Sequence, residues 1–187
     1  MKKSLVIIGV ILLVLFFAVS PFIGVYNNLI TAEENVNGKW AQVENQLQRR
    51  LDLIPNLVET VKGYAAHEKE TFTLVTEARA KAAGASSVKE QSEANSELTS
   101  ALSRLMVIVE QYPELKANEN FIRLQDELAG TENRIAISRK DYNDSVQSFN
   151  TLVKRFPNNI IAGMLNFVEK AYFEAEESAQ KAPKVSF

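Results

Sequence analysis

The feature that most constrains this chain is a stretch without any charged side chain, which runs from Ser4 to Ala32. Its most apolar part, Leu5 to Ile23, is interrupted only by Gly9, Ser20 and Pro21. At a rise of about 1.5 Å per residue, a helix of this length matches the roughly 30 Å thickness of the hydrocarbon core. A lone segment in lipid must satisfy its own backbone hydrogen bonds and therefore spans as a helix. The sequence predicts a membrane helix here.

A removable secretory signal is the alternative to an anchor. Ala18-Val19-Ser20 resembles the small-residue site at which such signals are cut. However, Pro21 would then occupy the first mature position, where cleavage is poorly tolerated, and the apolar run exceeds the roughly 7–15 residues of a typical signal. The chain has no cysteine that could carry a lipid. We therefore expect an uncleaved anchor in a membrane domain of residues 1–26.

Charges on either side of the stretch bear on its orientation. Lys2 and Lys3 precede it, whereas the next basic residue is Lys39, which follows Glu33 and Glu34. The positive-inside rule then places the N-terminus in the cytoplasm. The bulk of the chain is predicted to lie outside the cytoplasm.

Apolar residues recur at helical spacing through most of the remaining chain. From Val36 to Ala65 they fall, with a mean step close to 3.6, at Trp40, Val43, Leu47, Leu51, Ile54, Val58 and Val61. Pro55 interrupts this run. Because it lacks a backbone donor and crowds the preceding turn, it either kinks one long helix or separates two.

Three further helices are predicted along the chain. One covers residues 57–83 and ends at Gly84, and the next begins after an N-cap at Ser86 or Ser87 and is ended by Pro113. Asn118 is expected to cap the last long helix, which runs to Phe156. Apolar steps of three and four in the last two helices are typical of a bundle seam. The predicted fold is all-α, with an antiparallel up-and-down bundle over residues 27–157.

The chain after Pro157 is predicted to form a separate short amphipathic helix, residues 158–177. Its apolar side holds Ile160, Ile161, Met164, Leu165 and Val168. This side either covers the open end of the bundle or contacts lipid headgroups or a partner protein. The tail, residues 178–187, is polar and is predicted to be disordered.

The residue inventory offers little for catalysis or for metal binding. The chain has one histidine, His67, and no cysteine, whereas a di-metal helical bundle needs two Glu-x-x-His pairs. Neither a nucleophile elbow nor a glycine-rich phosphate loop is present. Without Lys2 and Lys3, 19 basic residues face 23 acidic ones, so nucleic acid is not an expected partner. We expect no enzyme activity, no cofactor and no metal.

Charged and amide side chains near Pro55 and on the last long helix form the candidate partner interface. They are Arg49, Arg50, Asp52, Asn56, Asn133 and Arg134. The competing interpretation is a solvated helix surface with local ion pairs, each worth about 0–1 kcal/mol. Thr131, a polar residue at a seam position, is expected either to set the register between helices or to line a polar contact.

Two segments carry a specific resemblance. Residues 48–67 read QRRLDLIPNLVETVKGYAAH, and residues 119–163 contain GTENRIA. With the apolar stretch, these resemble the LemA family of bacterial membrane proteins. The resemblance implies a single membrane helix followed by four long bundle helices, two of which meet at Pro55. It implies no catalytic residues and leaves the orientation open, because the family has also been described with its N-terminus outside.

These observations support one leading hypothesis for function. The chain is expected to be a single-pass protein of the bacterial inner membrane that acts as a binding scaffold or adaptor for another envelope membrane protein. One alternative is a sensor or signalling component, although only Met1 to Lys3 precede the span. The other alternative is a lipid-contacting protein that remodels membranes, for which the 158–177 helix is the support.

Overall fold

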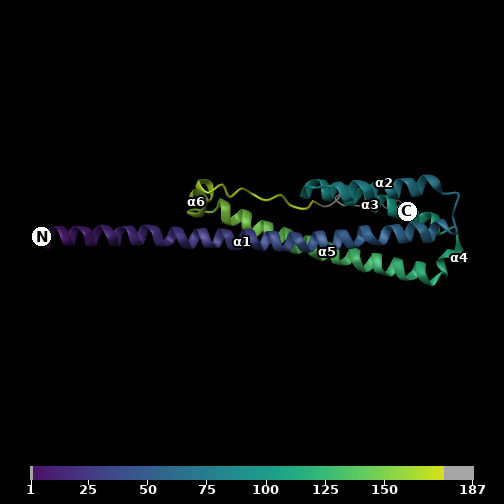
Figure 1. Cartoon of the computed structure of the whole chain (residues 1–187), viewed down its shortest axis with the longest axis horizontal. Coiled ribbons are helices and arrows are strands. Elements are labelled where there is room, and N and C mark those ends of the chain that lie inside the picture. Colours follow the sequence, from purple (N-terminus) through teal and green to yellow (C-terminus); the bar gives the residue numbers. More distant parts are fainter. Residues whose placement is uncertain (1, 175–187) are drawn as a thin grey trace, which may run out of the picture. The chain divides into compact units, whose positions relative to one another are not determined.

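The computed structural model describes residues 2–174, and for residues 2–6, 10–12 and 14–19 it describes the backbone alone. This part of the chain is helical with short turns and one extended segment near its end (Figure 1). The helices are α1 (Lys2–Lys62), α2 (Lys69–Gly84), α3 (Val88–Val109), α4 (Pro113–Lys116), α5 (Glu119–Lys154) and α6 (Asn158–Met164). The predicted all-α fold is confirmed.

The predicted membrane span, Leu5 to Ile23, falls largely on residues whose side chains lie outside the described ones. Among the described residues, no helix has both the length and the apolarity that crossing a membrane requires. The predicted disordered tail, residues 178–187, also lies outside the described residues.

Two alternatives were open at Pro55, and the break between two helices, which the resemblance implies, is wrong. Helix α1 runs without a break past Pro55, which is exposed to solvent. Proline cannot donate to the carbonyl four residues earlier, which belongs to Leu51. That oxygen instead accepts a hydrogen bond of 2.8 Å from Nε of Arg79 on α2. A side chain from another helix thus replaces the missing backbone donor.

The chain divides into two compact units, which we describe separately. The first unit holds the chain up to Lys39 together with Asp144–Lys170, and the second holds Trp40–Asn143 and the chain from Ala171 onward. In the second unit, α1, α2, α3 and α5 enclose one hydrophobic core. Its fully buried members include Ile54, Leu57, Val61, Val75, Leu98, Leu105, Leu115 and Phe121.

Neighbouring helices of the second unit run antiparallel. Lys62 lies over the ring of Phe72, near the start of α2, whereas Arg79 reaches back to Leu51. On the other side of α1, Arg49 pairs with Glu127 of α5, and Tyr64 accepts a hydrogen bond from Asn118 just before α5. Both sets of contacts reverse the chain order, as an up-and-down bundle requires.

Local signals in the sequence correctly predicted the end of α2 and the starts of α3 and α5. Ser87 caps α3: its hydroxyl accepts from the amide of Glu90, while the Glu90 carboxylate accepts from the amides of Ser86 and Ser87. Asn118 caps α5 through the amides of Asn120 and Phe121. Two expectations were wrong. The helix predicted over 57–83 is interrupted by turns at 63–68, and α3 ends at Val109, so that Pro113 starts α4 rather than ending α3.

The first unit packs α1 against α5 and the chain that follows α5. Leu29 and Val36 of α1 are buried, as are Val146 and Phe149 of α5. Helix α6 ends at Met164, well before the predicted end at residue 177. Residues 168–174 form no helix and run extended (Figure 1). Backbone groups of Lys170 and Phe173 in this segment bind asparagine side chains.

Candidate functional site

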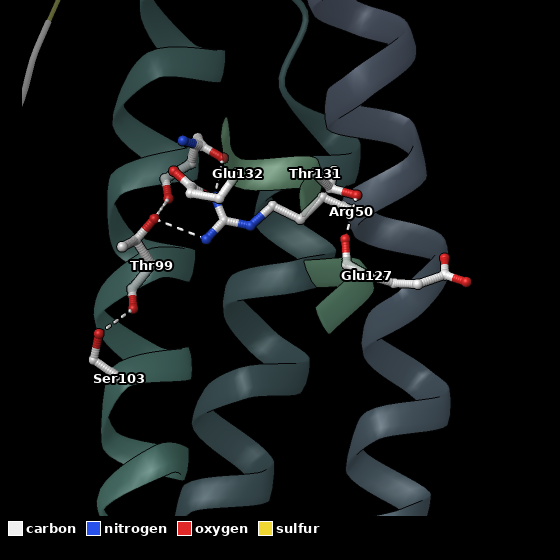
Figure 2. A network of polar contacts seen from close by, with 7 residues as sticks. Arg50, Thr99, Ser103, Glu127, Thr131 and Glu132 are labelled. Carbon is white, nitrogen blue, oxygen red and sulfur yellow. Dashed lines mark hydrogen bonds and ion pairs between the residues drawn. The ribbon is translucent and has the colours of Figure 1, made fainter. Parts of the chain in front are cut away.

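Arg50 is buried in the second unit, with only 4% of its surface exposed. Its guanidinium donates from Nη1 to Oδ1 of Asn95 (2.6 Å) and from Nη2 to the hydroxyl oxygen of Thr99 (2.9 Å), both on α3. Nη1 also lies 3.0 Å from Oε2 of Glu132 on α5. Figure 2 shows Arg50 reaching from α1 across to α3. The expectation that Arg50 lies on the helix surface is therefore wrong.

A planar guanidinium that binds groups on two other helices fixes how three helices lie together. Glu132 is almost half exposed, so water also solvates its carboxylate and weakens this ion pair. The hydrogen bonds to Asn95 and Thr99 are better shielded from water than the ion pair with Glu132. Arg50 and Asn95 also line a pocket of about 150 Å³ between α1, α3 and the end of α2. The site is thus a buried cluster of hydrogen bonds around Arg50, with the small pocket beside it.

Thr131 is fully buried on α5, as its seam position predicted. Its hydroxyl donates to the carbonyl oxygen of Glu127 in the same helix at 2.7 Å (Figure 2). The hydroxyl is therefore satisfied within its own helix, and neither of the two expected roles draws support from this bond.

The other residues of the predicted interface are exposed. Arg49, Asp52 and Asn56 follow steps of three and four and so share one face of α1. Arg49 forms an ion pair of 3.3 Å with Glu127 of α5, and Asp52 accepts a hydrogen bond from Gln48. Asn133 and Arg134 are exposed on α5. We call the five exposed residues (Arg49, Asp52, Asn56, Asn133 and Arg134) the polar face.

The residues predicted to line the short C-terminal helix separate into two groups. Ile160 and Met164 are exposed on α6, whereas Ile161 is half-buried. Leu165 and Val168 are exposed but lie beyond the end of α6. The buried residue of α6 is Ala162, which the prediction did not include.

His67 is exposed in the turn between α1 and α2. Within the described residues, no group of three or more histidine, cysteine or acidic side chains could hold a metal ion.

Sequence reasoning missed a clamp around Phe173 in the second unit. The Phe173 side chain is only 2% exposed, and its ring lies against Trp40 and under the guanidinium of Arg139. The carboxamide of Asn143 donates to the carbonyl oxygen of Phe173 and accepts from its amide, at 3.0 and 2.9 Å. Tyr142 donates to the carbonyl oxygen of Ala171, and burial raises the pKa of this phenol.

A second asparagine repeats this arrangement in the first unit. Asn150 donates to the carbonyl oxygen of Lys170 and accepts from its amide. Lys170 in turn pairs with Glu33 of α1 at 2.6 Å. Asn143 and Asn150 are seven residues apart on α5, and this heptad spacing of a strongly hydrogen-bonding side chain was the signal available in the sequence.

The comparisons with known proteins identify the family of this chain. The family model described as the LemA family matches residues 39–187. Magnetosome protein MamQ 2 of Paramagnetospirillum magneticum is 28% identical over an alignment 209 residues long, which covers 98% of this chain and 76% of that protein. Protein LemA of Metamycoplasma hominis is 26% identical over 157 residues, which cover 83% of this chain and 72% of that protein. This chain belongs to the LemA family.

Proposed function

We propose that this protein is a single-pass scaffold of the bacterial inner membrane that binds another envelope membrane protein through the polar face, and that it works by binding rather than by catalysis. The carrying observation is that α1 is one helix from Lys2 to Lys62. It joins the uncharged stretch to the core of the bundle, so a membrane anchor and a folded binding surface share one element.

The polar face is suited to directional recognition. Arg49 and Arg134 carry planar guanidinium groups that match carboxylates, and Asn56 and Asn133 add amide donors and acceptors. The exposed pair between Arg49 and Glu127 contributes little to folding, so it can open for a partner at small cost. Arg50 is excluded from this surface because it is buried, and its expected role is to hold the helices that carry the polar face.

The anchor and its orientation are tested together by labelling. The chain has no cysteine, so a single cysteine in place of Lys89, at the exposed start of α3, reports on one position. We expect an impermeant thiol reagent to label it in intact spheroplasts, and the protein to pellet with membranes at full length. Labelling only after lysis would show that the bulk of the chain lies in the cytoplasm. A mature N-terminus near Pro21 would show that the stretch is cleaved and is not an anchor.

The partner surface is tested by photocrosslinking in cells. A photoreactive residue at Asn56 or Asn133 is expected to give the same discrete adduct with a membrane protein. The matched control is Glu77, an exposed position on α2 outside the polar face. The adduct should be lost when Arg49 and Arg134 are both changed to Glu while Arg50 is kept. The same adduct from Glu77, or one that survives the double substitution, would refute the polar face as the interface.

A further inference from the structure

Helix α6 and its flanking residues expose apolar side chains that the core of the first unit does not use. Phe156 precedes α6, Ile160 and Met164 lie four residues apart on it, and Leu165 and Val168 follow it. Their exposed fractions range from 41% to 76%. We call these five residues the α6 apolar set. Single exposed apolar residues are ordinary, but five within one short segment indicate a contact surface.

Contacts of Phe167 and Lys170, which follow α6, place this segment beside the end of the apolar part of α1, Leu5 to Ile23. The ring of Phe167 meets the ring of Tyr26 edge-on, with centroids 6.4 Å apart. Tyr26 follows Ile23 by three residues, or about 4.5 Å along the helix. Farther along, Lys170 bonds to Glu33 of α1. The chain from Phe167 to Lys170 therefore runs along α1 away from Leu5–Ile23. Four of the five residues of the α6 apolar set precede Phe167, and Val168 follows it directly.

We propose that the α6 apolar set lies in the interfacial layer of the bilayer that the apolar part of α1, Leu5 to Ile23, spans, so that lipid covers this surface. The inference rests on the proposed anchor. A span that ends near Ile23 puts Tyr26 at the boundary between hydrocarbon and headgroups, where tyrosine is enriched. A surface at the same depth as Tyr26 contacts the headgroups. Apolar side chains there lower their free energy by entering the boundary between headgroups and acyl chains.

The charges around this surface indicate that apolar burial, and not attraction to anionic lipid, drives the contact. Lys154 pairs with Glu169 at 2.7 Å, and Lys170 pairs with Glu33 at 2.6 Å. Two of the nearby cations are thus already neutralised by carboxylates. Because each unpaired basic residue near an anionic surface adds only a modest attraction, the contact should persist in zwitterionic lipid and at high salt.

The test is fluorescence quenching on the full-length chain reconstituted into phosphatidylcholine vesicles with brominated acyl chains. A bimane label is placed on one cysteine at a time, at Met164, Val107 or Leu13. Met164 and Val107 are almost equally exposed, at 69% and 65%, but Val107 lies on α3 in the second unit. Leu13 lies within the predicted span and reports on the anchor itself.

We expect quenching at least threefold stronger at Met164 than at Val107, with little change in 1 M salt, and strong quenching at Leu13. Quenching at Leu13 with equally weak quenching at Met164 and Val107 would overturn this inference and leave the anchor standing. No quenching at Leu13 would overturn the anchor and the inference with it. Protection of Met164 that grows with protein-to-lipid ratio, without bromine quenching, would assign the surface to a second copy instead.

A second variant checks that the label does not itself create the contact. With the label at Val168, Phe156→Ser and Ile160→Ser should reduce bromine quenching at least twofold, because both side chains are exposed and their removal takes apolar surface from the proposed lipid contact. Circular dichroism should be unchanged. Undiminished quenching would show that the α6 apolar set is not what holds the segment at the membrane.

Discussion

Arg79 donates a hydrogen bond of 2.8 Å from Nε to the carbonyl oxygen of Leu51, the backbone acceptor that Pro55 leaves without its helical donor. Arg79 lies 28 residues farther along the chain, on α2. The bond explains how α1 continues through a proline that would otherwise leave a buried acceptor unpaired. It also ties α2 to α1 beside the pocket that Leu51 and Arg50 line.

This relationship predicts a coupling between two distant residues. Arg79→Met should lower the free energy of unfolding by about 1–2 kcal/mol, because it leaves the Leu51 oxygen without a donor. In a Pro55→Ala background the backbone amide of the introduced alanine can donate instead, so the loss should be clearly smaller. Urea unfolding of the fragment Gly24–Phe187 measures the four free energies. Equal losses in the two backgrounds would mean that Arg79 does not compensate for Pro55.

Arg50 and Arg49 are adjacent in the sequence, yet their substitutions should differ sharply. Arg50→Met leaves Asn95 and Thr99 without their charged donor and should cost about 1–3 kcal/mol of stability. Arg49→Met removes only an exposed pair and should cost less than about 1 kcal/mol. The same fragment and urea titration apply. A similar loss of stability at both positions would contradict the role of the buried Arg50 hydrogen bonds.

Phe173 should anchor the extended segment through its buried ring. Phe173→Ala removes that ring from its contacts with Trp40 and Arg139, and full loss of such burial costs up to about 3–5 kcal/mol. Trp40 is the sole tryptophan, so its emission should shift to the red as water reaches it. The control is Tyr172→Ala, next in the chain and 45% exposed, which should leave the emission unchanged. An unshifted spectrum for Phe173→Ala would refute the clamp.

The cap of α3 predicts a specific pH dependence. Hydrogen bonds from the backbone amides of Ser86 and Ser87 lower the pKa of Glu90 from its ordinary value of 4.5 to about 2. An acid with a depressed folded pKa stabilises the protein above its unfolded pKa and loses that contribution as the pH falls toward the folded value. The melting-temperature advantage of the parent over Glu90→Gln should therefore be full at pH 7 and shrink between pH 4.5 and 2.

A control separates this charge effect from helix capping in general. Asn118→Ala removes the neutral side-chain cap of α5 and should cost about 1 kcal/mol at both ends of that pH range. A difference between the parent and Glu90→Gln that stays constant from pH 7 to pH 3 would show that the carboxylate is not held by the two amides.

The candidate partner interface was predicted correctly from the sequence at some positions and wrongly at one. The pattern correctly indicated that Arg49, Asp52 and Asn56 lie on the surface, because their helical spacing opposes the apolar seam. The same reasoning failed for Arg50, one position away. An arginine at the edge of a seam can point to either side, and the donors and acceptors on neighbouring helices decide between them.

The sequence by itself determined the features that depend on near neighbours in the chain. Helical periodicity placed Val43, Ile54 and Leu105 in the core, and the caps at Ser87 and Asn118 use amides within three residues. Such signals are local, so a pattern reveals them.

Only the tertiary structure decided that α1 continues past Pro55, that Arg50 is buried and that Phe173 is held between side chains of α1 and α5. Each outcome depends on a partner between 28 and 49 residues away. A proline's missing donor or an arginine's charge is costly in isolation, and it becomes tolerable only when packing brings a specific group from another segment within hydrogen-bonding distance.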